Sequence, residues 1–177
     1  MKSIKWPTPF YYEFKEDLNT FDSEPCVVVF NDGHELQGKL THFSPEDSIL
    51  EVLTANGAIS KPKLQFVNHL RLVHPVNLKR RVGLIDERHA GGFEPSEKQN
   101  CSVLFTNGNK LDGETIGFVI DKTGLYLFLV GASGSVIRHF IPTQAIKNYR
   151  IGEEIGQMLV KENVVTQTEI ESGLEKQ

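Results

Sequence analysis

Along most of this chain, apolar residues alternate with polar ones in short runs, and each run ends at a polar turn. Val27–Phe30, for example, leads into Asn31-Asp32-Gly33. Alternation over a few residues, bounded by glycine, asparagine and aspartate, predicts β-strands joined by tight turns. After Gly152 the apolar residues recur at helical spacing instead: Ile155, Met158, Leu159, Ile170 and Leu174. We therefore predict a mainly β chain that ends in a helical segment.

The strand pattern occurs twice. The stretch Cys26–Gly38, CVVVFNDGHELQG, returns 75 positions later as Cys101–Gly113, CSVLFTNGNKLDG. At a spacing of 76 the match extends to Ile49 with Leu125, Val52 with Phe128, Leu70 with Ile146 and Arg71 with Lys147. Self-similarity of this kind indicates repeated structural units. The chain is therefore predicted to contain two copies of one small domain.

Each copy carries the turn and bend signals of a small barrel. Asp32-Gly33 and Asn107-Gly108 favour the positive φ angles of type I′ hairpins. Gly38 and Gly113 fall inside the strands that follow, where glycine marks a bend or bulge. Pro142–Ala145 suits one 3₁₀ turn before a last strand. We predict two tandem five-stranded barrels of the Src-homology-3-like or Sm-like kind, each about 50 residues long.

These signals divide the chain into an aromatic arm (1–25), a first barrel (26–74), a linker (75–99), a second barrel (100–151) and a helical segment (152–177). The arm holds Trp6 and a predicted short strand near Phe10–Phe14. We expect its aromatic side chains to cap the open end of the first barrel; the alternative is that they bind a ligand or partner. The basic triplet of the linker, Lys79–Arg81, is expected to be solvated, with contact to phosphate as the alternative.

Composition narrows the classes of function. With 39% apolar and 24% charged residues, the chain is an ordinary globular protein. A net charge of −4 and a pI near 5.9 provide no overall basic field for nucleic acid. The longest apolar run, Leu125–Val130, is much shorter than a membrane span, and the N-terminus lacks the apolar region of a signal peptide. We expect a cytoplasmic protein without membrane insertion.

The sequence contains no recognisable catalytic or metal-binding motif. Its histidines and cysteines lack the spacing of metal ligands, and Cys26 and Cys101 are expected to be buried free thiols. Gly108 and Gly113 have the glycine spacing of a phosphate-binding loop, but Glu114 follows where that loop has lysine. We therefore expect a non-enzymatic protein that holds no cofactor.

The tail, IGQMLVKENVVTQTEIESGLEKQ, resembles the first half of the MshE N-terminal domain, which opens ATPases of type II secretion and type IV pilus assembly. Upstream, Arg138–Pro142 and Ala145-Ile146 are similar to a phrase in the β-rich extensions of relatives of these ATPases. Two positions depart from the family motif: Glu154 replaces an arginine and Asn163 replaces a glycine. In that family the motif wraps cyclic di-GMP, so the resemblance implies these nucleotide-binding positions: Gly156, Leu159, Asn163, Ile170, Leu174 and Gln177.

The same resemblance implies a non-catalytic regulatory or docking module of a type II secretion or type IV pilus ATPase system. Its implied partners are secretion or pilus machinery proteins, and its implied ligand is cyclic di-GMP. A carboxylate at Glu154 would repel the phosphates of that nucleotide. Because the last helical pattern reaches Gln177 without a stop signal, we expect the chain to be a fragment of something longer.

A second resemblance points to RNA. Residues 27–52 are similar to the first Sm motif of bacterial Sm-like RNA chaperones, with a strand, Asp32-Gly33, an apolar residue, Gly38, Phe43 and an acidic residue in order. The second Sm motif is not recognisable, and the interleaved aromatic and basic residues of a base-stacking surface are missing. An Sm-like RNA-binding protein is therefore the alternative, and nucleic acid is not the expected partner.

Overall fold

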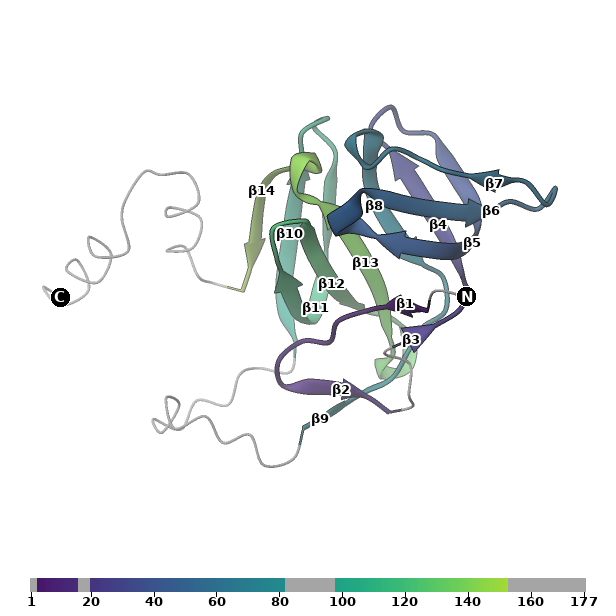
Figure 1. The fold of residues 1–177 in the computed structure, drawn as a ribbon. Coiled ribbons are helices and arrows are strands. Elements are labelled where there is room, and N and C mark those ends of the chain that lie inside the picture. The colour runs from purple at the N-terminus through teal and green to yellow at the C-terminus, as the bar shows by residue number, and fades with distance from the viewer. Residues whose placement is uncertain (1–2, 16–19, 82–97, 153–177) are drawn as a thin grey trace, which may run out of the picture.

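The structure is a computed structural model that describes residues 3–15, 20–81 and 98–152 (Figure 1). Within these ranges the chain is mainly β, as predicted, and its helical turns are short 3₁₀ segments. The predicted helical segment and every implied nucleotide-binding position, Gly156 to Gln177, lie outside the described residues.

Ten strands form one continuous sheet. The first copy supplies β4 (Glu24–Phe30), β5 (Glu35–Ser44), β6 (Ile49–Leu53), β7 (Ile59–Ser60) and β8 (Val67–Leu72). The second copy supplies β10 (Gln99–Phe105), β11 (Lys110–Ile120), β12 (Gly124–Val130), β13 (Val136–Pro142) and β14 (Ile146–Ile151). Their order across the sheet is β14-β10-β11-β12-β13-β8-β4-β5-β6-β7.

The two copies have the same internal order, with the fifth strand beside the first. They are joined where β13, the fourth strand of the second copy, pairs with β8, the fifth strand of the first, through His139 opposite Arg71 and Phe140 opposite Leu70. The sequence predicts two separate barrels, whereas the described strands form one sheet in which no strand pair closes either copy on itself. We call the β8–β13 contact the seam.

Strand pairing corrects the alignment of the two copies. Val28 and Val103 are equivalent, and they lie opposite Leu70 and Tyr149, so the fifth strands match at a spacing of 79. In the third strands Val52 matches Leu129, at a spacing of 77. The predicted spacing of 76 is therefore wrong. For the third strand the error is one residue, which turns every side chain to the opposite face of a sheet.

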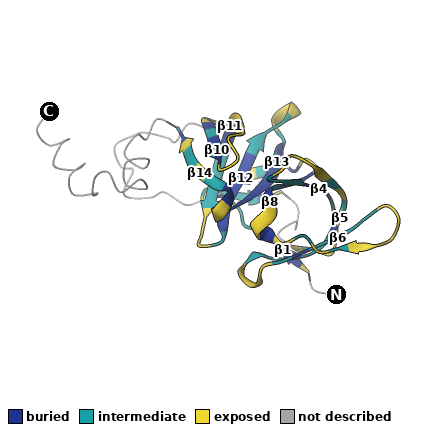
Figure 2. Ribbon diagram, turned by 90° about the horizontal axis from the view of Figure 1, so that it is seen from above, coloured by how far each residue is buried: buried dark blue, intermediate teal, exposed yellow. Residues whose placement is uncertain are grey.

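The cause of that error is β12, which is buried on both faces. Leu125 and Leu127 belong to the core of the second copy, whereas Tyr126 and Phe128 belong to the core of the first. Figure 2 shows buried residues along β12 and β13 in the middle of the molecule. Because one face of β12, a strand of the second copy, belongs to the core of the first copy, the two copies are packed together and are not independent domains.

The N-terminal arm completes the first core, as the sequence predicts. Ile4, Trp6 and Phe14 are buried in it, and the Trp6 ring stacks on Phe43 with 5.5 Å between centroids. Two small ribbons hold the arm: β1 (Ile4–Lys5) pairs with β3 (Thr20–Phe21), and β2 (Tyr12–Phe14) pairs with β9 (Leu78–Arg80).

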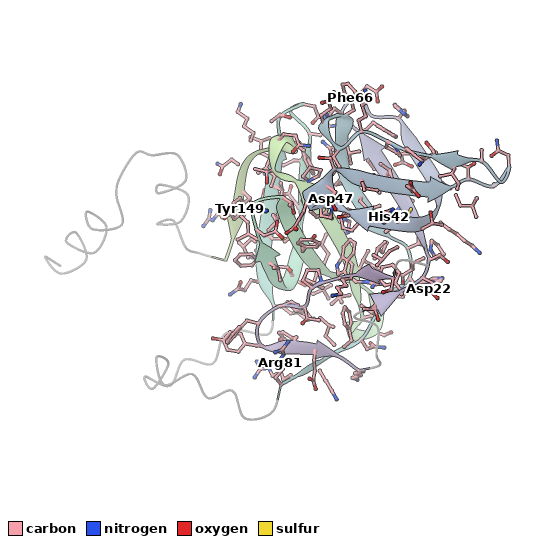
Figure 3. All side chains as sticks on the ribbon, in the orientation of Figure 1. Asp22, His42, Asp47, Phe66, Arg81 and Tyr149 are labelled. Carbon is pink, nitrogen blue, oxygen red and sulfur yellow. The ribbon has the colours of Figure 1, made fainter. Side chains whose placement is uncertain are left out.

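Lys79 and Arg80 of the basic triplet lie on β9, and Arg81 follows it; all three residues are exposed, as expected. Lys79 pairs with Glu13 at 3.1 Å. The Arg81 Nε donates to the Tyr12 carbonyl at 3.0 Å, and Figure 3 shows Arg81 beside the arm. These contacts of Lys79 and Arg81 help to hold the N-terminal arm, a role that the composition did not indicate.

The predicted type I′ hairpins are wrong, whereas the 3₁₀ turn at Thr143–Ala145 is confirmed. In the first hairpin only Gly33 has a positive φ, the Gly33 N–H donates to the Phe30 carbonyl at 3.0 Å, and the Phe30 N–H donates to the His34 carbonyl at 2.9 Å. Gly108 repeats this geometry. A three-residue loop with a left-handed glycine in its last position is the bulge-type hairpin turn.

Gly38 and Gly113 are equivalent in sequence, but we expect them to respond differently to alanine. A Cβ at Gly38 would run into the Leu53 carbonyl and would lie 2.6 Å from Val52 Cγ1, whereas a Cβ at Gly113 would lie 3.7 Å from Leu129. Gly38→Ala should lower the free energy of unfolding by about 1–3 kcal/mol, and Gly113→Ala by less than about 0.5 kcal/mol. Urea denaturation of both variants checks this, and equal losses would contradict it.

Candidate functional site

The outer edge of β14 is the candidate site, because the equivalent edge of the first copy, on β8, pairs with a further strand. The equivalent strand β8 has a neighbour on each side, β4 and β13. Within the described residues, β14 has a strand neighbour on one side alone, β10. Figure 3 marks Tyr149 on this strand. Among the described strands, this edge therefore occurs once with a neighbour, at β8, and once without, at β14.

The backbone geometry of β14 suits an added strand. The Gly152 N–H donates to the Asn100 carbonyl at 2.8 Å, and the equivalent Val73 N–H donates to the Pro25 carbonyl at 2.9 Å. Because antiparallel pairs alternate, the even-numbered residues of β14 bond to β10, and the backbone N–H and C=O of Ile151 point to the outer side. An extended peptide can pair with such groups.

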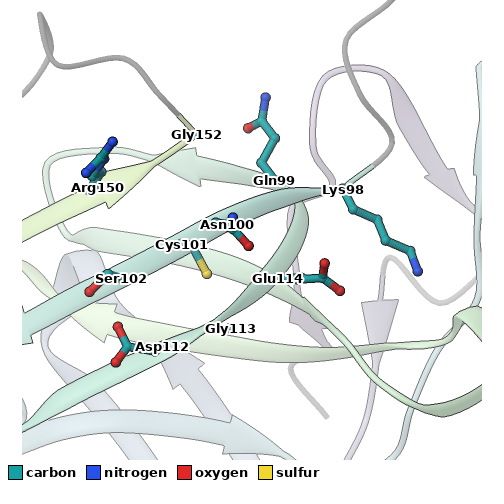
Figure 4. A pocket seen from close by; sticks show the side chains of 10 residues that line it. All are labelled: Lys98, Gln99, Asn100, Cys101, Ser102, Asp112, Gly113, Glu114, Arg150 and Gly152. Atoms are coloured by element: carbon teal, nitrogen blue, oxygen red, sulfur yellow. The ribbon is translucent and has the colours of Figure 1, made fainter.

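A hollow of about 900 Å³ lies over the face next to this edge (Figure 4). Its lining includes Asn100, Ser102, Asp112, Glu114 and Arg150. Strand register places Ser102 between Asp112 on one side and Arg150 on the other. A side chain projecting from a strand added to β14 would therefore enter a surface with both signs of charge.

Arg150 is the basic group of this surface that lies on the edge strand itself. It is exposed, and the ion pairs of the described residues do not include it. Its neighbour across β10, Asp112, is paired with Lys110 at 3.6 Å. Arg150 is thus available to a partner that brings its own carboxylate.

The opposite end of the sheet is built to resist pairing. β7 has only two residues, and Pro62 stands at the position equivalent to His139 of β13. The exposed Lys61 and Lys63 flank Pro62. Short strands, proline and lysine are the usual protection of a sheet edge. The two ends of the sheet therefore differ, and of the two end strands in the described part of the chain β14 is the longer, with six residues against two.

A buried ion pair lies where the arm and the two copies meet. The Arg138 side chain is 1% exposed and bonds through Nη2 to a carboxylate oxygen of Glu24. Three rings surround its guanidinium carbon, Phe21 at 5.4 Å, Phe14 at 5.7 Å and Trp6 at 6.0 Å. Burial lowers the pKa of Arg138, and the Glu24 carboxylate opposes that shift. This pair joins β4 to β13, and the arm packs its rings against the guanidinium, so we interpret it as a structural feature.

Two histidines lie at the seam. The rings of His69 and His139 are 5.8 Å apart, and His69 stacks on Phe105 at 5.6 Å. His69 Nδ1 is 2.8 Å from the Asn68 side-chain oxygen, whereas His139 Nδ1 is buried without a partner. Burial, with a contribution from Arg71, lowers the pKa of His69 to about 4; burial, His69 and Arg71 lower that of His139 to about 3.

Both cysteines are buried free thiols, as predicted. Burial raises the pKa of Cys26 to about 12 and that of Cys101 to about 11. Both are therefore neutral near pH 7, where a thiol is a poor nucleophile. In the described part of the chain, no three His, Cys, Asp or Glu side chains gather as a metal site would require. The same part contains no helix that is long and apolar enough to cross a membrane.

Sequence reasoning missed both Arg150 and the Glu24–Arg138 pair. The duplication held a signal for the edge, because two copies of one strand set that meet edge to edge leave one fifth strand at an end. No local signal marks Arg138 as buried, since it lies in an ordinary strand next to His139.

Comparisons with known proteins assign no family. No family model and no curated protein matches the chain. Among solved structures, the raptor adenovirus 1 fibre head, in a β-hairpin-deleted form, is 9% identical, with a TM-score of 0.14, over 74% of this chain and 96% of that one. A likeness at this level carries no argument about fold or function.

Proposed function

We propose that this chain is a non-catalytic docking module that takes an extended segment of a partner protein as an eleventh strand on β14. The observation that supports the proposal is the contrast between β8, which is paired on both sides, and the equivalent β14. The hollow beside β14 adds room for the side chains of the partner. We also propose that each copy curls into a small barrel of the Src-homology-3-like or Sm-like kind. Bulges at equivalent positions, one where β4 pairs with β8 and one where β10 pairs with β14, support this proposal.

A peptide taken from the chain itself tests docking. β13 occupies the edge of the first copy, so residues 134–142 provide the natural sequence for such an edge. Arg138 should be replaced by leucine in this peptide, because Gln99 stands in the second copy where Glu24 stands in the first. We call this probe the β13 peptide.

We expect the fluorescent β13 peptide to bind the full chain with a Kd on the order of 100 μM, measured by anisotropy. The same peptide N-methylated at the Phe140 amide is the control, because it keeps the side chains and loses the backbone donor. Absence of binding, or equal binding of the methylated peptide, would overturn docking by strand addition.

The system that the module serves is a separate proposal. The resemblance of residues 155–177 to the MshE N-terminal domain supports a place in a type II secretion or type IV pilus ATPase system, in the cytoplasm, with secretion or pilus proteins as partners and a link to cyclic di-GMP. Isothermal titration of cyclic di-GMP into this chain and into a version extended by about 100 residues tests it. Heat of binding from the longer chain alone would support the proposal, and none from either would contradict the nucleotide link.

A further inference from the structure

The proposed function leads to a more specific inference, which rests on it, about the strand that pairs with β14. We propose that it is a strand of a different protein, which places a carboxylate opposite Arg150 and a large apolar side chain at the next position, opposite Tyr149. Three features support this description: the charge of β14, the protected far end of the sheet, and the seam as a template.

A second copy of this chain suits the edge poorly in a β14–β14 arrangement. β14 reads Ile-Lys-Asn-Tyr-Arg-Ile, so it carries Lys147 and Arg150 and no acidic residue. If two β14 strands paired with each other, the two cations of one strand would lie close to the two cations of the other. Like charges on facing strands are unfavourable, and no carboxylate of either strand offsets them.

A head-to-tail arrangement of two molecules of this chain is also disfavoured. It would place β7 of one molecule against β14 of the next, in the way that β13 pairs with β8 within one molecule. The position that pairs with Arg71 at the seam is His139, and its equivalent in the first copy is Pro62. Pro62 lies between Lys61 and Lys63, so this end would bring further cations to Arg150.

The seam indicates what a favourable partner presents. There Phe140 lies opposite Leu70 and is fully buried, and His139 lies opposite Arg71. At the open edge Tyr149 takes the place of Leu70 and Arg150 that of Arg71. A large apolar residue opposite Tyr149 repeats the first contact. The second position differs: Arg150 is exposed, so it gains from a carboxylate instead of a neutral imidazole.

Two versions of the β13 peptide test the charge preference, one with His139→Glu and one with His139→Lys. At low salt we expect the glutamate peptide to bind the full chain about 5-fold more tightly than the lysine peptide. Arg150→Glu in the chain should reverse that order. Lys39→Glu, which changes an exposed lysine on β5, is the matched control and should leave the order as it is.

The outcomes separate this inference from the function on which it rests. If both peptides bind equally tightly and N-methylation still abolishes binding, docking stands and the acidic partner is wrong. If neither peptide binds, both are wrong. Analytical ultracentrifugation of the full chain completes the test, because a dimer that Arg150→Glu strengthens or weakens would place a second copy on this edge and overturn the inference.

Discussion

Replacing Arg138 by methionine is expected to lower the free energy of unfolding by about 3–5 kcal/mol, because it leaves a buried carboxylate without its cation. Glu24 is 9% exposed, and the other basic side chain near its carboxylate is His74, whose Nδ1 lies 3.9 Å away and whose side chain is largely exposed. The change also removes the guanidinium from the rings of Trp6, Phe14 and Phe21. Guanidinium chloride denaturation followed by Trp6 fluorescence measures the loss.

Two further variants show whether the loss comes from the buried pair. Adding Glu24→Gln to Arg138→Met removes the unpaired charge, and it should recover part of the stability. Lys61→Met removes an exposed ammonium that pairs with the half-buried Glu51 at 2.8 Å, and it should cost less than about 1 kcal/mol. If Arg138→Met costs no more than Lys61→Met, the buried pair does not stabilise the junction of β4 and β13.

Mild acid is expected to destabilise the seam. The pKa values of His69 and His139 in the folded chain, about 4 and about 3, are below the unfolded value of about 6.5. Both rings are therefore neutral when folded, and their contribution is fully present above pH 6.5. As the pH falls below 6.5, the unfolded chain takes up protons that the folded chain does not, so stability falls until the folded pKa values are reached.

Between pH 7.5 and pH 5 the two histidines should together remove about 3 kcal/mol, after a discount for the partly exposed His69. Denaturation at several pH values measures this loss, and a His69→Gln, His139→Gln double variant should flatten the profile in that range. Histidine NMR titration provides the direct check. Two rings that titrate near pH 6.5 in the folded chain would contradict the account.

The sequence predicted local structure better than the way in which the copies meet. Strand positions, the arm and the buried thiols follow from alternation and from the burial of aromatic and sulfur side chains. The turn type was missed because Asp-Gly and Asn-Gly serve both type I′ turns and bulge-type turns, which differ by one residue in loop length. The register of β12 was missed because Leu125–Val130 is apolar on both faces and has no polar side to orient it.

The candidate site depends on the seam, and the seam could not be predicted locally. Only two residue pairs join β8 to β13, and their residues are about 70 positions apart in the chain. Arg138 looks like a surface residue until β13 is packed on β4 and the arm is folded over it. The nucleotide-binding positions implied by resemblance, from Gly156 to Gln177, lie outside the described residues and stay a prediction.

Locating the bound β13 peptide tests the central claim most directly. In an NMR titration of the ¹⁵N-labelled full chain, we expect the amides of β14 and of the facing β10 to shift, and the Ile151 amide to become protected from hydrogen exchange. The amides of β7 and of the seam strands should keep their shifts. Shifts centred on β7, or on the seam, with β14 unchanged, would contradict the claim that β14 is the docking edge of this protein.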